Sequence, residues 1–378
     1  MRIAVVVGDP NRFGGGNHFA SNLIKILRRG GNEVSLCSWE KPVEGYCHEG
    51  FLEAERIYLP SFLIKKFIKS GALWKILIAS NSAIKKCVKD FKPDAVINAN
   101  VEPAAFRNVK MAKRIFYCHF PTEFKAYKQD LLHLIYRIPY WYWHYRELSR
   151  LDAIVCNSHY TKQVAYLCWK NYVPKDKFYV IYPAIDITLF EKEVKRDRKI
   201  CYVGRIAEGK GIEHVLDNFV NIYGKIDAAL EIAGGLSDYN RSYYERIRNR
   251  ISELQREGLP IKLEINVPYS RIIETLLSSR VMVSFNPEEH FGIVPVEAQA
   301  AGCVPIVAKG GGQLETVRHR KTGFLVDSPE KIARYIMMLF EDEGLWKKMS
   351  QSAKKWALNF SLEKISLEWS AFLHSLAG

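Results

Sequence analysis

The sequence contains no apolar run close to the roughly 20 residues that a membrane-spanning helix requires. Its first residues also lack the basic start, apolar core and small-residue cleavage site of a secretory signal. The eight cysteines are scattered without a C-x-x-C pair, which argues against a zinc knuckle and gives no disulfide framework. We therefore expect a cytoplasmic protein, at most peripheral to the inner face of a membrane, whose cysteines are free.

Length and charge indicate two domains of unequal charge. A chain of 378 residues, 48% hydrophobic and 25% charged, suits two ordinary soluble domains. Residues 1–190 carry 28 Lys and Arg against 16 Asp and Glu, whereas residues 191–378 carry 27 against 25. The first half therefore either meets an anionic partner or uses its charge only for solubility.

A lysine-rich segment at 61–93 accounts for much of this excess. It holds eight lysines and one acidic residue among apolar residues at helical spacing. One interpretation is a pair of amphipathic helices on an anionic membrane surface, with Lys65, Lys66 and Lys69 as contacts. The other is a surface helix whose lysines face solvent and whose apolar stripe faces the core. The sequence leaves both open.

Short β-branched runs alternate with amphipathic stretches in both halves of the chain, a pattern typical of parallel sheets with crossover helices. We predict two Rossmann-like, doubly wound α/β domains. The predicted strands are 3–7, 33–39, 94–100, 114–120, 153–158 and 178–183 in the first half, and 199–204, 228–235, 261–267, 281–285, 304–308 and 323–326 in the second.

The predicted boundaries follow from composition. Residues 1–182 form the first domain, and the proline and charge run of 183–199 form a linker. Residues 200–358 form the second domain. The amphipathic segment 359–378 needs a surface to cover, and we expect it to return to the first domain. Two such domains facing each other would bind ligands in a cleft at the carboxyl ends of their strands.

Three consecutive glycines, Gly14 to Gly16, follow the first predicted strand. A nicotinamide dehydrogenase would use this stretch as its fingerprint and Glu40 for the ribose, but G-G-G-N-H-F is not G-x-G-x-x-G. We interpret Gly14 to Gly16 as a floor without side chains, with unusual φ angles, for the phosphate and sugar of a donor, with Gly15 and Gly16 as its contacts. The alternative is a flexible turn.

The densest set of candidate residues lies in 286–317. After a strand, a loop carries Glu289, and Phe291-Gly292-Ile293 leads into a short helix that Gly302 ends. The backbone amides at this helix start favour a phosphate group. We expect Glu289 to accept hydrogen bonds from sugar hydroxyls and Glu297, placed in the first helical turn, to bind a ribose diol. Alternatively, Glu297 complements the helix dipole and Glu289 is a solvated loop acid.

These residues resemble the E-x7-E signature of glycosyltransferase family 4, whose members are retaining enzymes of the GT-B fold. A second stretch, "VGRIAEGKGIEHVL" at 203–216, resembles the family's Arg and Lys pair, and "GGGQLETV" and "RKTGFLV" continue the likeness. The resemblance implies that Arg205 and Lys210 hold the donor diphosphate and act in catalysis with Glu289. A cationic pair would stabilise a diphosphate leaving group.

The resemblance also assigns residues to the reacting sugar and the acceptor. His119 ends a predicted strand where the family often has a histidine that touches the reacting centre. Asn17, His119, Lys128 and Arg137 are candidate acceptor-binding residues. No D-x-D occurs, so we expect no metal and no cofactor, with the nucleotide sugar as a substrate.

Within the family, "YCHFPTE", "NSHYTKQVAYLCW" and "EHFGIVPVEAQAAG" are most similar to the mannosyltransferases that extend dolichol-linked oligosaccharides. This implies GDP-mannose as donor and a lipid-linked or other glycan as acceptor. UDP-glucose and UDP-N-acetylglucosamine stay open as donors, and a GT-B epimerase is a remoter alternative. The positive charge also suggests a nucleic-acid-binding protein, but no sequence signature of nucleic-acid binding accompanies the basic residues. We expect no nucleic-acid partner.

Overall fold

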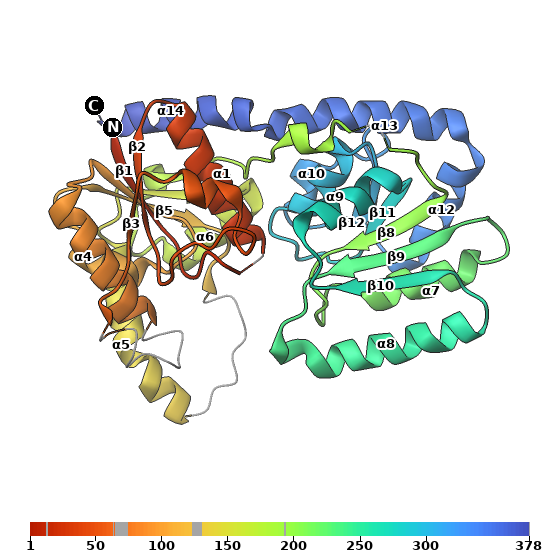
Figure 1. Ribbon diagram of the computed structural model, residues 1–378, viewed down its shortest axis with the longest axis horizontal. Helices are drawn as coiled ribbons and strands as arrows, with labels where there is room; N and C mark the ends of the chain where they lie inside the picture. Colours follow the sequence, from red (N-terminus) through yellow and green to blue (C-terminus); the bar gives the residue numbers. More distant parts are fainter. Residues whose placement is uncertain (13, 63, 65–74, 123–130, 193, 378) are drawn as a thin grey trace. The chain divides into compact units, whose positions relative to one another are not determined.

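The structure is a computed structural model that describes residues 1–12, 14–62, 64, 75–122, 131–192 and 194–377 (Figure 1). It consists of two compact units. The first contains residues 1–184 and 362–378, and the second contains residues 185–361. Each unit is built around one parallel sheet.

The sheet of the first unit has the strand order β3-β2-β1-β4-β5-β6-β7, and every pairing is parallel. The strands are β1 (Arg2–Val6), β2 (Glu33–Cys37), β3 (Arg56–Tyr58), β4 (Ala95–Asn98), β5 (Lys113–Cys118), β6 (Ala153–Cys156) and β7 (Phe178–Val180). The central strands β4 and β6 are buried along their whole length because helices cover both faces of the sheet.

Helices form one layer on each face of this sheet. The described elements are α1 (Gly15–Arg29), α4 (Asn81–Asp90), α5 (Leu131–Leu148), α6 (His159–Trp169) and α14 (Leu362–Ala377), with 3-10 helices at Glu49–Glu53, Pro103–Asn108 and Lys175–Lys177 and a π-helical turn at Lys75–Ser80. Apolar residues of α1 and α14 pack together on one face. Those of α4, α5 and α6 pack on the other.

The sheet of the second unit has the order β10-β9-β8-β11-β12-β13 and is again parallel. Its strands are β8 (Lys199–Val203), β9 (Ala229–Gly234), β10 (Ile261–Ile265), β11 (Val281–Ser284), β12 (Val304–Ala308) and β13 (Phe324–Val326). In both sheets, the order in which successive strands are added therefore reverses beside the first strand. The switch point lies between β1 and β4 in the first sheet and between β8 and β11 in the second. This is the strand order of doubly wound folds.

The helices of the second unit also form two layers. They are α7 (Ile212–Ile222), α8 (Arg241–Arg256), α9 (Tyr269–Ser278), α10 (Ile293–Ala300), α11 (Gln313–Thr316), α12 (Ile332–Glu341) and α13 (Glu343–Ala357), with 3-10 helices at Ile187–Phe190, Asp238–Asn240, Pro329–Lys331 and Leu358–Phe360. Helices α7 and α8 cover one face of the sheet and α9 and α10 cover the other (Figure 1).

The predicted fold class is confirmed, and each of the twelve predicted strands overlaps an observed one. Strand β3 was not predicted, because three residues, Arg-Ile-Tyr, give no readable alternation. The segment 183–199 contains more structure than a linker: Ile185 bridges to Ser361, Phe190 is buried in the second unit, and β8 begins at Lys199.

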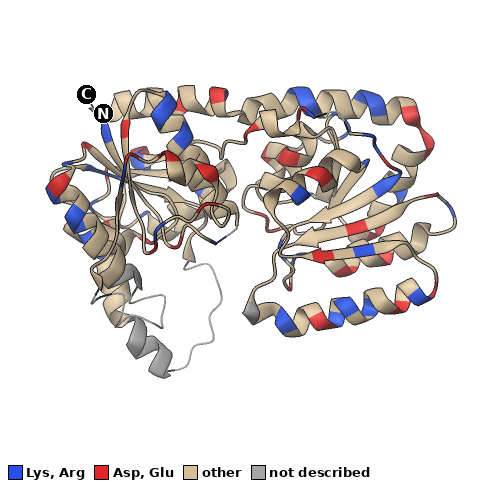
Figure 2. Ribbon diagram, viewed as in Figure 1, with Lys and Arg blue, Asp and Glu red and all other residues tan. Residues whose placement is uncertain are grey.

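Part of the lysine-rich segment follows the surface-helix interpretation. In α4, Ala83, Ile84 and Cys87 are buried, whereas Lys85 and Lys89 are exposed. Figure 2 shows the basic residues along this helix. Lys65, Lys66 and Lys69 lie outside the described residues.

Helix α14 supplies a large part of the first unit's core, although it follows the whole second unit in sequence. Trp369 is 1% exposed, and its ring centroid lies 6.2 Å from that of Tyr117 on β5. Ile365 and Phe372 are buried beside it. The amphipathic pattern of this segment thus corresponds to an intramolecular contact.

We expect Trp369→Ala to lower the free energy of unfolding by about 3–5 kcal/mol, because it leaves a large cavity between α14 and the sheet. Urea denaturation monitored by far-UV circular dichroism measures the change. Leu367→Ala on the same helix is the matched control, since Leu367 is 69% exposed; it should change stability by less than about 0.5 kcal/mol. Equal effects of both variants would contradict the packing role of α14.

Candidate functional site

The candidate site residues of the second unit follow the two strands on either side of its switch point. Arg205 and Lys210 lie in the loop after β8, and Glu289 lies in the loop after β11. In open α/β sheets, the crevice at the carboxyl ends of such neighbouring strands is where ligands bind. The topology therefore places all three in the position that this fold uses for ligands.

An ion pair joins the two loops. Lys210 Nζ donates to Glu289 Oε2 at 2.7 Å, and Asn286 Nδ2 donates to the same oxygen at 3.1 Å. The two charged side chains are partly buried, with 22% and 28% exposed. A cation and a carboxylate that are both reachable from solvent form a polar surface which can offer donors to phosphate oxygens and acceptors to hydroxyls.

The surroundings of Glu289 favour its charged form. Burial alone would raise the pKa of this carboxyl, but the ammonium of Lys210, with help from His290 and the Asn286 amide, outweighs burial and holds the pKa below its ordinary value. Glu289 is therefore an anion at neutral pH and can only accept hydrogen bonds.

Glycines behind the loop fix the position of Glu289. Gly312 N donates to the carbonyl oxygen of Glu289 at 2.8 Å. Gly311 has a φ of +53°, and a Cβ there would collide with the same carbonyl group. The backbone of Gly310 to Gly312 therefore packs directly against the loop that carries Glu289, and a larger residue at these positions would displace that loop.

Helix α10 begins beside this loop with an open N-terminus. Its N-cap is Gly292, with a φ of +90°, and it has neither a side-chain cap nor an acidic residue in its first turn. The first amides therefore have no side-chain partner within the helix and favour an anion. Ile293 is the first helical residue. Phe291 is 3% exposed with its ring near Phe360, so its side chain is part of the core.

The prediction that Glu297 lies in the first helical turn is wrong. It is the fifth residue of α10 and is 3% exposed. The Tyr269 hydroxyl at the start of α9 donates to Glu297 Oε1 at 2.7 Å. Burial, and then the negative charge of Glu297, raises the pKa of Tyr269 well above its ordinary value. The phenol is therefore a constant hydrogen-bond donor to this carboxylate.

Arg205 differs from Lys210 because its side chain is exposed. Its backbone is held in place by the Tyr202 hydroxyl, which donates to the Arg205 carbonyl oxygen at 3.0 Å. The loop is thus fixed while the guanidinium is accessible to a ligand. An exposed guanidinium on a fixed backbone suits a phosphate contact.

The glycine stretch of the first unit forms the start of α1, which begins at Gly15. Gly14 has a φ of 161°, which is extended backbone that any residue adopts, and Gly15 and Gly16 are helical. The predicted unusual φ angles are therefore wrong. A Cβ on Gly16 would meet Asn100 Cβ at 3.6 Å and His119 Nε2 at 3.7 Å.

Asn17 holds the loop that precedes α1. Its amide nitrogen donates to the carbonyl oxygens of Asp9 and Arg12 at 2.7 and 2.6 Å, and it accepts from Asn100 Nδ2 at 2.5 Å. Asn100 Oδ1 in turn accepts from Gly8 N at 2.9 Å. Asn17 is 8% exposed, and these bonds join the ends of β1 and β4. Its acceptor-binding role stays a prediction.

His119 directly follows β5, as predicted, and is partly exposed. Its Nε2 lies 2.8 Å from the carbonyl oxygen of Ala99, which assigns the proton of the neutral ring to Nε2. The ring meets Phe19 edge-on, and Asn157 donates to the His119 carbonyl oxygen. The structure therefore brings Gly16, Asn100 and His119 together. Lys128 and the side chain of Arg137 lie outside the described residues.

Sequence reasoning named the glycines at 310–312 only as part of the family likeness and missed three further contributors to these sites. Tyr269 and Asn286 hold the two candidate carboxylates, Asn100 joins two strand ends, and the G-G-G stretch supports a loop. Asn100 and Asn286 each follow a strand at a switch point, which is a signal that the sequence contains. Tyr269 has no such signal.

Within the described ranges, no group of His, Cys, Asp and Glu residues has the arrangement of a metal site. In the same part of the chain, no helix combines the length and apolar character of a membrane span.

The wild type should lose stability relative to Glu289→Gln as the pH falls. A lowered pKa in the folded state means that Glu289 adds stability above its ordinary value of 4.5 and loses that contribution as pH falls through the folded value. Urea unfolding of both proteins at neutral pH and at several lower values measures the difference. A stability gap that does not depend on pH would contradict the Lys210–Glu289 pairing.

Two family models match the chain. The model described as Glycosyltransferase Family 4 matches residues 13–189, and the model described as Glycosyl transferases group 1 matches residues 186–356. The two matched regions overlap at residues 186–189, close to the division between the two units.

Curated relatives include alpha-1,3/1,6-mannosyltransferases named ALG2. The Homo sapiens protein is 28% identical over 59% of this chain and 58% of its own length. The Dictyostelium discoideum protein is 25% identical over 79% of this chain and 78% of its own. The chain spans 50–60% of the length of the first relatives it matches.

Solved structures share the fold across the chain. Anabaena Alr3699/HepE in complex with UDP covers 99% of this chain and all of its own, with a TM-score of 0.73 and 17% identity. The sucrose-phosphate synthase of Thermosynechococcus elongatus covers 99% and 98%, with a TM-score of 0.75 and 18% identity. With the two family models matched across residues 13–356, the chain belongs to glycosyltransferase family 4 and has the GT-B fold.

Proposed function

We propose that this protein transfers a mannosyl group from GDP-mannose to a lipid-linked glycan, with retention of the anomeric configuration. The observation that carries the proposal is the pairing of Lys210 with Glu289 beside the open N-terminus of α10. This arrangement offers cationic and amide donors for a diphosphate and a carboxylate acceptor for sugar hydroxyls. The names of the ALG2 relatives support the mannosyl group.

Arg205, Lys210 and the first amides of α10 bind the donor diphosphate in this proposal. As the glycosidic bond breaks, negative charge grows on the leaving phosphate, and fixed positive groups stabilise it. The ammonium of Lys210 has three donors, so it can keep its bond to Glu289 while it contacts a phosphate oxygen. These three groups offset the diphosphate charge, so we propose that the enzyme needs no metal ion.

Two carboxylates orient the donor without attacking it. Glu289 accepts hydrogen bonds from hydroxyls of the transferred sugar, and Glu297, held by Tyr269, accepts from the ribose diol. A departing phosphate oxygen takes the proton of the acceptor hydroxyl, which attacks from the face that the diphosphate leaves. This scheme requires no protein nucleophile, unlike the carboxylate pair of a retaining glycosidase.

We assign the first unit to the acceptor. His119 Nε2 lies 2.8 Å from the carbonyl oxygen of Ala99, and in this proposal the ring contacts the reacting sugar. Gly15 and Gly16 provide backbone without a side chain at the start of α1. A lipid-linked acceptor would bring the enzyme to the cytoplasmic face of a membrane.

The identity of the donor nucleotide has a specific alternative to GDP. Solved structures of Anabaena Alr3699/HepE contain UDP or UDP-glucose, so a UDP-glucose- or UDP-N-acetylglucosamine-dependent enzyme is the second candidate. A panel of GDP- and UDP-sugars, scored by thermal shift and by hydrolysis, separates the two. Stabilisation by UDP-sugars alone would replace the donor and leave the site unchanged.

Lys210→Gln should reduce kcat/KM for sugar transfer by about 100-fold or more, because a fixed cation opposite developing charge contributes on this scale. Initial rates with the donor found in the panel measure the effect. Lys225→Gln, which removes an exposed lysine from the loop after α7, is the matched control and should change little. Transfer by Lys210→Gln at the wild-type rate would refute the diphosphate assignment.

Chelation should leave the activity unchanged, because Arg205, Lys210 and the amides of α10 perform the charge neutralisation that a divalent ion supplies elsewhere. Transfer rates before and after treatment with excess EDTA, followed by gel filtration, measure this. Loss of activity that added Mg²⁺ or Mn²⁺ restores would show that the enzyme uses a metal ion.

A further inference from the structure

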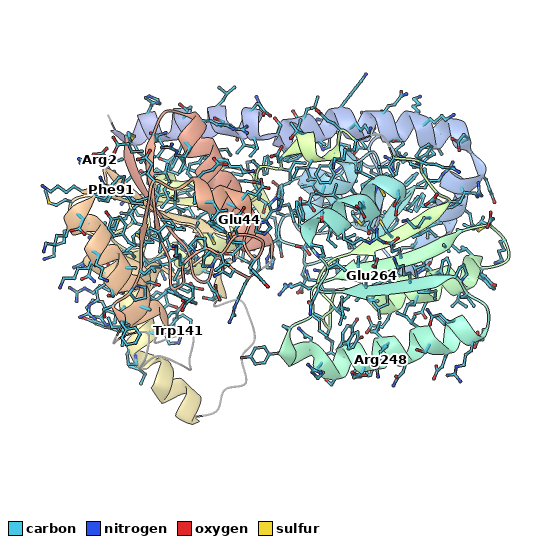
Figure 3. All side chains as sticks on the ribbon, in the orientation of Figure 1. Arg2, Glu44, Phe91, Trp141, Arg248 and Glu264 are labelled. Carbon is cyan, nitrogen blue, oxygen red and sulfur yellow. The ribbon has the colours of Figure 1, made fainter. Side chains whose placement is uncertain are left out.

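Helix α5 and the segment 107–111 present exposed apolar and aromatic side chains to solvent. Met111 is 93% exposed, and Ile138 and Tyr142 are each 58% exposed. Ile138, Tyr142 and Arg146 follow each other at intervals of four residues, so they lie along one face of the helix. Figure 3 marks this helix by Trp141.

Arginines surround an aromatic residue on the same surface. The Arg107 guanidinium lies 4.0 Å from the centre of the Trp143 ring, and that of Arg146 lies 4.9 Å from it. Arg146 Nη1 also donates to the Tyr142 hydroxyl at 3.2 Å. Two cations and two amphipathic rings therefore form one connected patch.

The exposed charge of this surface has one sign. In the segments 102–114 and 138–152, the exposed charged side chains are Arg107, Lys110, Lys113, Arg146 and Arg150. The carboxylates there are less exposed: Glu147 is fully buried between Arg114 and Arg150, and Glu102 and Asp152 are partly buried. The surface thus combines exposed positive charge, of which only Arg150 is paired with Glu147, with apolar tips.

We propose that this surface, formed by residues 107–111 and the exposed face of α5, binds an anionic lipid bilayer. Tyrosine and tryptophan rings prefer the headgroup region, and arginines bind lipid phosphates. A nucleic acid or an acidic protein would match the cations but would give no favourable site to Met111 and Ile138, whose apolar surface gains from burial in the acyl boundary. The proposal rests on the exposed groups of this surface and does not require a particular sugar donor.

Co-sedimentation of the full chain with vesicles tests the proposal. With phosphatidylcholine vesicles that contain about one third phosphatidylglycerol, we expect Arg107→Gln/Arg146→Gln to lower the partition coefficient about 10-fold or more, given the contribution of each basic residue near an anionic surface. Arg256→Gln/Arg334→Gln removes the same charge from exposed sites on α8 and α12 and is the matched control. It should bind like the wild type.

The apolar tips need their own variant. Met111→Ser/Tyr142→Ser keeps every charge and should also lower vesicle binding, by about fivefold. If only the arginine variant loses vesicle binding, the surface contacts headgroup phosphates without burying its apolar tips in the bilayer, and the proposal is wrong. It is equally wrong if the wild type does not bind the vesicles or if both surface variants bind like the control.

Donor binding separates this result from the proposed function. Thermal shift with GDP and UDP should be the same for the wild type and all three double variants, because none of them changes the second-unit site. Vesicle binding without any nucleotide response would leave this inference standing and refute the proposed transferase activity. A nucleotide response without vesicle binding would refute this inference and leave the proposed transferase activity standing.

Discussion

The bond between Lys210 and Glu289 is the contact on which the candidate site depends. It joins the loops that follow β8 and β11, the two parallel strands at the switch point of the second sheet. Because the bond neutralises both groups while they stay reachable from solvent, it keeps a cation and an anion available for a ligand at the same point. The glycines at 310–312 make this possible, since their bare backbone allows the Glu289 loop to lie directly against the turn after β12.

The first unit solves the same topological problem with neutral groups. Where β1 and β4 separate, Asn17 and Asn100 hold the loop after β1 through amide hydrogen bonds, and no ion pair is involved in these contacts. The charged side chains of this loop, Asp9 and Arg12, instead pair with each other, and Arg12 Nε lies 3.3 Å from Asp9 Oδ2.

Sequence patterns were sufficient for the fold because parallel strands buried on both faces read as nearly continuous apolar runs, as in β4 and β6. They also placed Arg205, Lys210 and Glu289 correctly after their strands. They misplaced Glu297, because the start of a helix is hard to locate without a capping side chain, and α10 begins at Ile293 after the N-cap Gly292, which has none. They could not find Tyr269, since its partner Glu297 is 28 residues away and only the packing of α9 on α10 brings the two together.

The return of α14 to the first unit affects the order in which the chain can fold. Trp369 and its neighbours are synthesised after the whole second unit, so the apolar face of α1 that they cover stays open during most of translation. The second unit, whose residues are contiguous, can complete its core earlier than the first, although the first begins the chain. A nascent chain of this protein therefore has its amino-terminal unit finished last, and an interrupted chain would expose the surface that α14 covers.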